Sequence, residues 1–343
     1  MMYSLLIMTL ATSTTITLAS HHWLLAWLGL EINTLAMIPI IIKSHNPRAT
    51  EAATKYFLIQ ALAAAMILFA SIINTWQTGH WTIMETTSRT ATITLTLALV
   101  MKLGLAPAHF WYPEVIQGST MTTALILSTW QKLAPLSLMY MTLHQLPPTI
   151  LLTIGLISTL VGGWAGLNQP QLRKIMAFSS IAHMGWLITA MTTNHSLATL
   201  TLMMYITMTT AMFTALTHTT TKTLTDMATT WTQNPLLLST MTLTLMSLGG
   251  LPPLTGFTPK WLITTELIST TLLPAATLLI MASLPSLFFY IRLAYFTTLT
   301  APPSNMNNKL NWRFNNTTPK PLALALTATT MLLPITPLLY PTL

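Results

Sequence analysis

The sequence predicts an all-α polytopic membrane protein with about eleven transmembrane helices. Two observations predict this fold class. Of the 343 residues, 52% are hydrophobic and only 6% are charged, whereas a soluble domain carries roughly 25% charged residues. In addition, apolar runs close to the roughly 20 residues needed to cross the hydrocarbon layer recur along the whole chain.

Loop residues divide the chain into eleven expected spans, with boundaries good to about four residues. Threonine is abundant inside these spans, and its hydroxyl can donate to a carbonyl of the preceding turn, so it is tolerated in lipid. The spans lie near 2–20, 23–42, 51–74, 87–118, 121–144, 149–168, 172–192, 196–218, 236–272, 274–297 and 320–340.

Two of these spans, the fourth and the ninth, are too long for one simple helix. The fourth contains "LAPAHFWYPE" with Pro107, and the ninth contains "GGLPPLTGFTPK" with Pro252, Pro253 and Gly256. Proline removes a backbone donor and clashes with the preceding turn, so we expect both helices to be broken there. Broken backbone at membrane depth is tolerated only inside protein or beside a water-filled cavity.

The two expected breaks lie five spans apart, which predicts an internal repeat. Because five is odd, two five-helix units would have opposite orientations in the membrane, and paired broken helices in an inverted repeat indicate a transporter's working site. We expect one membrane domain over 1–343, with repeats near 1–145 and 149–297 and a final helix near 320–340.

Positive charge in the loops predicts the orientation. The loops on the N-terminal side hold most of the fixed positive charge, and among those on the other side only Arg89 interrupts a nearly uncharged set. The positive-inside rule therefore places the N-terminus on the matrix or cytoplasmic side. The N-terminal-side residues are Lys43, Arg48, Arg173, Lys174, Lys222, Lys309 and Arg313.

Composition also excludes several kinds of chemistry. The chain has no cysteine, which excludes cysteine-ligated iron–sulfur clusters and thiolate zinc sites. Its nine histidines form no obvious set of ligand pairs, and neither a G-x-G-x-x-G nor a P-loop pattern is present. Basic residues are thinly spread, which argues against nucleic-acid binding. We expect no metal site, no bound cofactor and no redox chemistry in this chain itself.

Five ionisable residues fall inside apolar spans and are the candidate site. They are Glu31 in span two, Lys102 and Lys132 in spans four and five, His183 in span seven and Lys260 after the break in span nine. A charged side chain at the bilayer centre costs roughly 2.5–3.5 kcal/mol on insertion scales. Five such placements need partners, water or neutralisation, and together they are typical of a proton relay.

Structural explanations compete with this one. A lysine or glutamate near a helix end can extend its charge to the interface, and a single buried histidine such as His183 is often a satisfied core residue. Lys102 fits the first explanation poorly, because about 15 residues at 1.5 Å place it roughly 20 Å from the helix start. A nearby carboxylate favours a charged lysine and burial disfavours it, so movement of Glu31 relative to Lys102 would change proton occupancy.

At "LGLEINTLAMIPI", "MKLGLAPAHFWYPEV", "WQKLAPLS", "QLRKIMAFSSIAHMGW" and "GGLPPLTGFTPKW" the chain resembles the antiporter-like membrane subunits of respiratory complex I, the NADH–ubiquinone oxidoreductase. These subunits are related to multisubunit cation/proton antiporters. The resemblance covers essentially the whole chain, in order. It implies the antiporter-like fold in a shortened, eleven-span form.

The resemblance also implies roles for the five candidates in proton translocation. Glu31 is implied as the carboxylate paired with Lys102, the lysine of the first channel. Lys132 is implied as the bridge toward the centre, and His183 as a member of the central polar axis. Lys260 is implied as the link to the output side or to the next subunit.

The same resemblance implies where the chain works and with what. It implies a multi-pass protein of the mitochondrial inner membrane, with its N-terminus in the matrix, that contacts lipid and the other membrane and accessory subunits of the complex. NADH, FMN, iron–sulfur clusters and ubiquinone are implied to bind to other subunits. Two alternatives are a stand-alone cation/proton antiporter and a purely structural scaffold; the buried charges argue against the scaffold.

Overall fold

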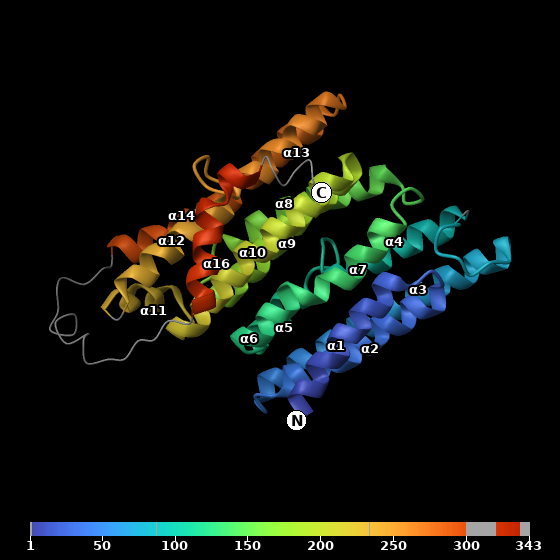
Figure 1. The fold of residues 1–343 in the computed structure, drawn as a ribbon, viewed down its shortest axis with the longest axis horizontal. Coiled ribbons are helices and arrows are strands. Elements are labelled where there is room, and N and C mark those ends of the chain that lie inside the picture. The colour runs from blue at the N-terminus through green and yellow to red at the C-terminus, as the bar shows by residue number, and fades with distance from the viewer. Residues whose placement is uncertain (1, 87, 233, 300–319, 337–343) are drawn as a thin grey trace. The chain divides into compact units, whose positions relative to one another are not determined.

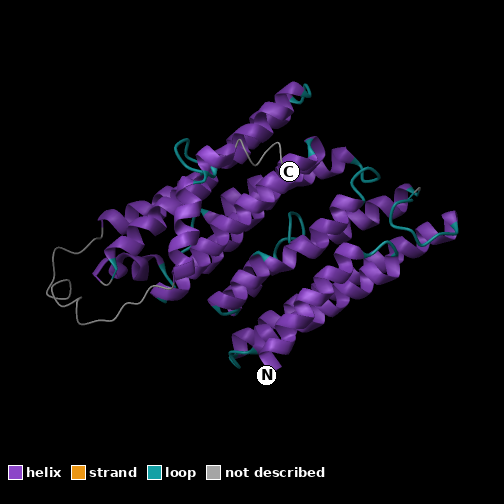
Figure 2. Ribbon diagram, in the orientation of Figure 1, coloured by secondary structure: helices purple, strands orange, loops and turns teal. Residues whose placement is uncertain are grey.

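The computed structural model describes residues 2–86, 88–232, 234–299 and 320–336. These residues form helices joined by loops, and no strand occurs among them (Figure 2). The chain divides into two compact units, Met1–Ile154 and Gly155–Leu343. Each unit has its own helices and its own candidate residues.

The first unit is a bundle in which α3 packs against α2, α4 and α5, and α7 packs against α1, α2, α4 and α6 (Figure 1). The α1 and α2 helices lie side by side along much of their length. The helices are α1 (Met2–Ala19), α2 (Trp23–Ile42), α3 (Pro47–Thr78), α4 (Arg89–Leu103), α5 (Trp111–Gly118), α6 (Met121–Ser128) and α7 (Trp130–Met141).

The second unit is built around α9, most of whose residues are buried. The α9 helix packs against α10, α13 and α14, and α16 packs against α10 and α12. The boundary between the two units falls within α8 (Pro148–Gly166). The other elements of the second unit are α9 (Leu172–Thr193), α10 (His195–Thr219), α11 (Leu224–Thr229), η1 (Thr230–Thr232), α12 (Pro235–Gly249), α13 (Phe257–Ser269), α14 (Leu273–Leu299), α16 (Lys320–Met331) and η3 (Leu333–Ile335).

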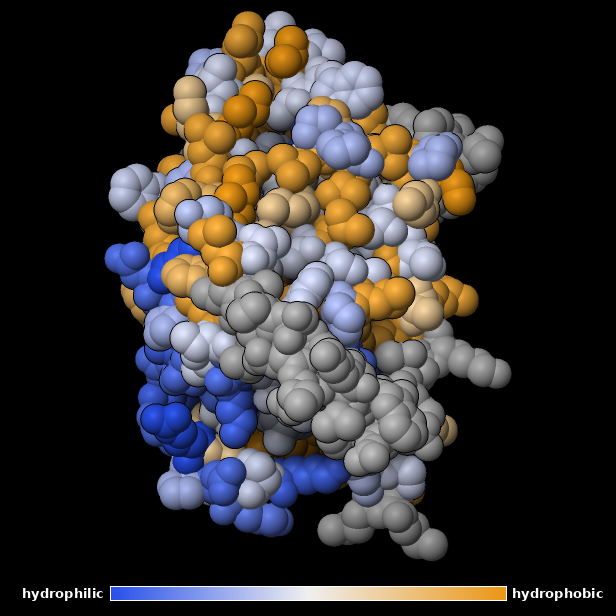
Figure 3. Space-filling model, turned by 90° about the vertical axis from the view of Figure 1, so that its left-hand side faces the viewer, coloured by the Kyte–Doolittle hydropathy of each residue, from blue (hydrophilic) through white to orange (hydrophobic). Residues whose placement is uncertain are grey.

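Helix length and composition show a polytopic membrane protein. Within the described ranges, six helices are long and apolar enough to cross a membrane: α2, α3, α8, α9, α10 and α14. Shorter apolar helices accompany them in both units. Many large hydrophobic side chains are exposed, and Figure 3 shows hydrophobic residues, mixed with residues of intermediate hydropathy, over the upper part of one face and hydrophilic residues gathered at its lower left.

The regions of the two expected breaks each contain two helices with a loop between them. The first helix of each pair, α4 or α12, is followed by a glycine in the left-handed conformation, Gly104 with φ 71° and Gly250 with φ 81°. Pro107 lies in the loop before α5, after a cis peptide bond from Ala106. A left-handed residue ends a helix because it turns the chain away from the helical path.

The fifth expected span is also divided, which the sequence pattern did not predict. Its two parts, α6 and α7, meet at Thr129, where the backbone has φ −110° and ψ −67°. The Thr129 hydroxyl donates to the Leu125 carbonyl at 2.8 Å. Within α7, Pro135 has no N–H to donate to the carbonyl of Gln131, four residues earlier, so one carbonyl in the first turn of this helix lacks its usual backbone donor.

The threonine prediction is confirmed by the hydrogen bonds inside the helices. The hydroxyls of Thr17, Thr96 and Thr189 donate to carbonyls three residues earlier, at 2.8, 2.7 and 2.8 Å. These side chains are buried without needing a partner on another helix. Threonine therefore adds little polar surface to the apolar helices that contain it.

Candidate functional site

The first candidate site begins at the C-terminus of α4. Gly104 donates its N–H to the carbonyl of Met101 at 3.2 Å, and Leu105 donates to Val100 at 3.1 Å. These bonds turn the chain out of the helix directly after Lys102. The lysine consequently sits in the last turn of α4, where the negative end of the helix dipole favours a positive charge.

Neutral side chains satisfy carbonyls in this last turn. The indole N–H of Trp111 donates to Met101 at 3.2 Å, and the amide of Gln60 donates to the carbonyl of Lys102 at 3.4 Å. Terminal carbonyls of a helix need such partners, because no following turn supplies an N–H. The ammonium group of Lys102 is therefore not required to cap its own helix.

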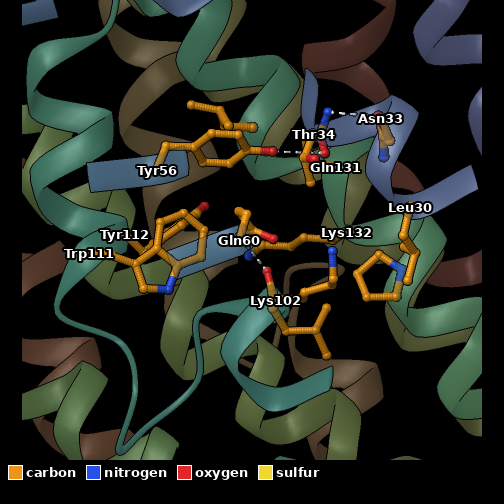
Figure 4. Close-up of a pocket in the computed structure, with 13 residues that line it drawn as sticks. Leu30, Asn33, Thr34, Tyr56, Gln60, Lys102, Trp111, Tyr112, Gln131 and Lys132 are labelled. Carbon is orange, nitrogen blue, oxygen red and sulfur yellow. Dashed lines mark hydrogen bonds between the residues drawn. The ribbon is translucent and has the colours of Figure 1, made fainter. Parts of the chain in front are cut away.

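A cavity of about 20 Å³ lies beside this helix end, which is room for about one water molecule. Two of the three lysines chosen from the sequence, Lys102 and Lys132, line it (Figure 4). Its lining residues are Leu30, Asn33, Thr34, Tyr56, Gln60, Lys102, Leu103, Trp111, Tyr112, Leu127, Gln131, Lys132 and Pro135.

The two lysines on this cavity are buried, and Glu31, near them, is half-buried. Lys102 is 7% exposed and Lys132 is 3% exposed. Among the described residues, the Lys102 Nζ and the Glu31 Oε2 have no hydrogen-bond partner, although the two side chains interact electrostatically. The Lys132 Nζ lies 5.0 Å from the centre of the Tyr112 ring. An unpaired donor and acceptor near a water-sized cavity suit a water-mediated contact.

Sequence reasoning missed a set of neutral polar residues at this site. Tyr56 donates its hydroxyl to Gln131 Oε1 at 3.5 Å, and the Gln131 amide donates to Asn33 Oδ1 at 3.0 Å. The dashed lines in Figure 4 mark these bonds beside the cavity. One signal was available, because Gln131 precedes Lys132 and Asn33 follows Glu31 by two positions in otherwise apolar helices.

The second unit has a different arrangement at its break. Gly250 donates its N–H to the Ser247 carbonyl at 2.9 Å, which turns the chain out of α12. The ammonium of Lys260, on α13, reaches back and donates to the carbonyl of Gly249 at 2.8 Å. Gly256 packs so closely on the Ser247 carbonyl that any Cβ there would overlap it.

Pro252 and Pro253 are exposed in the loop of this second break. A second cavity of about 20 Å³ lies next to it, and His183 and Lys260 both line this cavity. The ring of His183 lies 5.9 Å from the ring of Tyr205, centre to centre. The remaining lining residues are Trp186, Thr201, Tyr205, Met208, Gly256, Pro259 and Ile263.

The structure thus groups the five candidates by unit. Glu31, Lys102 and Lys132 lie together in the first unit, and His183 and Lys260 lie together in the second. In the ranges that the structure describes, no three histidine, aspartate or glutamate side chains gather in a way that could hold a metal ion. The chemistry available at both sites is the gain, loss and transfer of protons.

Comparison with known proteins gives matches over nearly the whole chain. Residues 20–288 match the family described as "NADH:quinone oxidoreductase/Mrp antiporter, TM", and residues 287–340 match "NADH dehydrogenase subunit 2 C-terminus".

Two relatives, both called "NADH-ubiquinone oxidoreductase chain 2", are 52% identical to the chain. The relative from Sylvisorex ollula aligns over 99% of this chain and 98% of its own length. The relative from Coturnix japonica aligns over 97% and 96%. Among solved structures, respiratory complex I from Thermus thermophilus with bound aureothin contains a similar subunit. Its TM-score is 0.86 at 26% identity, and the match covers 99% of this chain and 79% of that one.

Proposed function

The chain belongs to the NADH:quinone oxidoreductase/Mrp antiporter family, and we propose on that premise that it is a proton-translocating membrane subunit of an NADH–ubiquinone oxidoreductase. It contributes to a translocase without carrying redox chemistry itself. The support is twofold. Relatives with this name match it at 52% identity over nearly its full length, and ionisable side chains are buried at both helix breaks.

Buried Lys102 is the proton carrier in this proposal. Its unpaired ammonium, which interacts electrostatically with Glu31 and lies beside a cavity for about one water, is the observation that carries the proposal. When Glu31 is ionised and near, it favours the charged lysine. When the carboxylate moves away or is neutralised, burial favours release of the proton. Lys132, on the same cavity, is the next acceptor.

His183 and Lys260 continue the relay in the second unit. Both line one cavity, and the imidazole can accept and donate protons near neutral pH. Because a charged donor makes the stronger hydrogen bond, loss of a proton from Lys260 would weaken its bond to the carbonyl of Gly249. Proton transfer at this lysine is consequently tied to the backbone of the break.

The membrane arrangement is part of the proposal. Eleven spans are obtained when the six-residue α11 is left out and the pairs α4 with α5, α6 with α7, and α12 with α13 each count as one. The pairs α4 with α5 and α12 with α13 then fall five spans apart. Support for two inverted five-helix repeats comes from this spacing. The positive loop residues, including Lys43 and Arg173, support an N-terminus in the matrix of the mitochondrial inner membrane.

Partners and cofactors follow from membership in an oxidoreductase assembly. We place NADH, FMN, iron–sulfur clusters and ubiquinone on other subunits of the complex; a chain with no cysteine cannot ligate iron–sulfur clusters in the usual way. The chain contacts other membrane and accessory subunits and lipid. A stand-alone cation/proton antiporter is less favoured, because the relatives that match the chain end to end are oxidoreductase subunits by name.

The test is Lys102→Met in the assembled complex, reconstituted in sealed vesicles. Methionine keeps the length and packing but removes the proton site, so we expect assembly to survive and coupled turnover to fall. Glu31→Gln should give a milder defect, and Lys222→Met, the same substitution at an exposed loop lysine, should give none. Unchanged quinone reduction with an unchanged proton-to-electron ratio in Lys102→Met would overturn the relay. Purification of the native chain as a free oligomer would overturn the assignment to the complex.

A further inference from the structure

A pair of neutral amides joins the two helices that carry the charges of the first site. Gln131 on α7 donates its side-chain N–H to the Asn33 Oδ1 on α2 at 3.0 Å. Asn33 is 2% exposed, and Gln131 is partly buried at the edge of the cavity. A buried amide that loses its partner costs about 1–3 kcal/mol, so this bond resists separation of the two helices.

The amides sit next to the ionisable groups in sequence. Asn33 lies two residues after Glu31, and Gln131 directly precedes Lys132. The bond between them therefore fixes the backbone that carries the carboxylate relative to the backbone that carries one of the cavity lysines. It does this without adding any charge to the site.

The bond lies in the first turn of α7, which lacks one backbone hydrogen bond. This helix begins at Trp130, directly after the interruption at Thr129, so Gln131 lies in its first turn. Pro135 also leaves the Gln131 carbonyl without its usual donor from the next turn. Because one backbone hydrogen bond is missing from this turn, side-chain contacts add to what holds it in place.

Both ends of the Gln131 amide are engaged. Its oxygen accepts from the Tyr56 hydroxyl on α3 at 3.5 Å, while its nitrogen donates to Asn33. The Tyr56 ring packs against Trp111 at 5.9 Å between ring centres, and Trp111 caps the helix of Lys102. A continuous set of contacts thus runs from α2, through α7, α3 and Trp111 of α5, to the end of α4.

We infer that Gln131 and Asn33 are positioning residues that set the separation of Glu31 from the cavity lysines, and thereby the coupling of proton transfer to electron transfer. An amide neither releases nor accepts a proton at physiological pH, so this pair is a spacer rather than a conductor. The inference rests on the proposed function. For any carboxylate and lysine about 6 Å apart at an effective dielectric constant of about 20, each added ångström changes the proton affinity of the lysine about twofold.

The decisive variant is Gln131→Met, made in the whole complex in sealed vesicles. Methionine matches the length of glutamine but cannot bridge Asn33 and Tyr56. We expect assembled complex that still reduces ubiquinone, a lower proton-to-electron ratio, and a pH profile displaced by about 0.3 unit for each ångström of added separation. Gln169→Met is the matched control, because among the described residues that amide donates to the carbonyl of Ala165, four positions earlier in the chain; it should change neither readout.

Rescue distinguishes positioning from general packing. The exchange Asn33→Gln with Gln131→Asn keeps both amides and their summed length, so it should restore the ratio and the pH profile toward those of the parent. Gln131→Asn alone is too short to reach Asn33 and should behave like Gln131→Met. Should Gln131→Met fail to assemble, this single variant and the exchanged pair carry the test.

The outcomes separate the two proposals. A parental ratio and pH profile in assembled Gln131→Met would overturn the positioning role, as would an exchanged pair no better than Gln131→Asn alone. If Lys102→Met uncouples the same vesicles, the relay stands even when the positioning role fails. If Lys102→Met also pumps normally, the proposed function itself is wrong.

Discussion

The two helix breaks use the same backbone turn but satisfy it with different donors. After α4 the left-handed residue is Gly104, and the neighbouring carbonyls receive the indole of Trp111 and the amide of Gln60. After α12 the left-handed residue is Gly250, and the last carbonyl of the helix receives the ammonium of Lys260. A neutral cap thus serves the first break and a charged cap serves the second.

This difference indicates that two roles of a buried lysine, capping a helix end and exchanging a proton, can be separated. In the first unit the capping duty belongs to neutral groups, so the ammonium of Lys102 is left without a hydrogen bond among the described residues. In the second unit Lys260 performs the capping itself. Substituting the two lysines should therefore have unequal effects on stability even if both affect pumping.

The largest effect should come from the tight packing in the second break. Gly256→Ala would place a Cβ on the carbonyl of Ser247, and overpacking that moves backbone costs about 3 kcal/mol or more. In Gly104→Ala the new Cβ would lie 3.2 Å from atoms of Trp111 and Tyr112, and the residue would keep a left-handed φ of 71°. The expected loss of stability is about 1–2 kcal/mol. The thermal inactivation midpoint of each purified complex measures both; equal shifts would contradict the contrast between the breaks.

Lys260→Met should give the next largest loss of stability. It leaves the carbonyl of Gly249 without the donor that now binds it at 2.8 Å, which costs about 1–3 kcal/mol. Lys102→Met leaves no carbonyl unpaired and should cost less. The comparison is made on the assembled complexes by thermal inactivation. A Lys102 variant less stable than the Lys260 variant would show that the capping duties are assigned wrongly.

Trp111→Phe should have a smaller effect. The indole donor to Met101 is lost, but that carbonyl keeps the N–H of Gly104 at 3.2 Å, so about 0.5–1.5 kcal/mol is expected. Phenylalanine preserves most of the ring packing against Tyr56 and Tyr112. A shift in the thermal midpoint as large as that of Lys260→Met would mean that the neutral cap is not redundant.

The smallest effect should come from a surface charge outside both breaks. The backbone N–H of Thr223, then its hydroxyl, and the N–H of Lys222 hold the pKa of Asp226 below its usual value. A lowered pKa stabilises the folded state above the pKa of the unfolded chain, and this contribution disappears as pH falls through the folded-state pKa. The stability difference between the parent and Asp226→Asn should therefore be small at neutral pH and absent in acid. A difference that grew in acid would contradict this.

The sequence predicts most of the helices because the length of an apolar run and the glycines and prolines that end it are local properties. The run expected at 172–192 is α9, Leu172–Thr193, and glycines and prolines stand where α4 gives way to α5 and α12 to α13. The division at Thr129 was missed because no glycine or adjacent proline precedes it. Charge in an apolar span is a strong local signal, so Glu31, Lys102 and Lys132 could be selected from the sequence, and the structure places them around one region.

The missed parts of the site depend on which helix faces meet. Gln131 and Asn33 are 98 residues apart in sequence, and helical periodicity does not tell which turn of α7 lies opposite which turn of α2. The capping role of Lys260 could likewise not be predicted from the sequence, because it depends on how the loop between α12 and α13 brings Lys260 back toward Gly249. Sequence patterns identified the groups that carry charge, whereas the neutral groups that hold them in place required the structure.

The internal hydrogen bonds of threonine have a consequence for how this sequence can diverge. The hydroxyls of residues such as Thr17 and Thr96 donate to carbonyls of their own helices. Replacement by serine, or by alanine where neighbouring side chains can fill the space of the lost atoms, therefore leaves no group on a neighbouring helix without its hydrogen-bond partner. Asn33, Gln60 and Gln131 lack this latitude, since each serves a group on another helix. Substitutions at threonines of this kind are therefore expected to be tolerated one at a time. A substitution at one of the three amides is expected to need a second substitution that restores a partner for the group on the other helix.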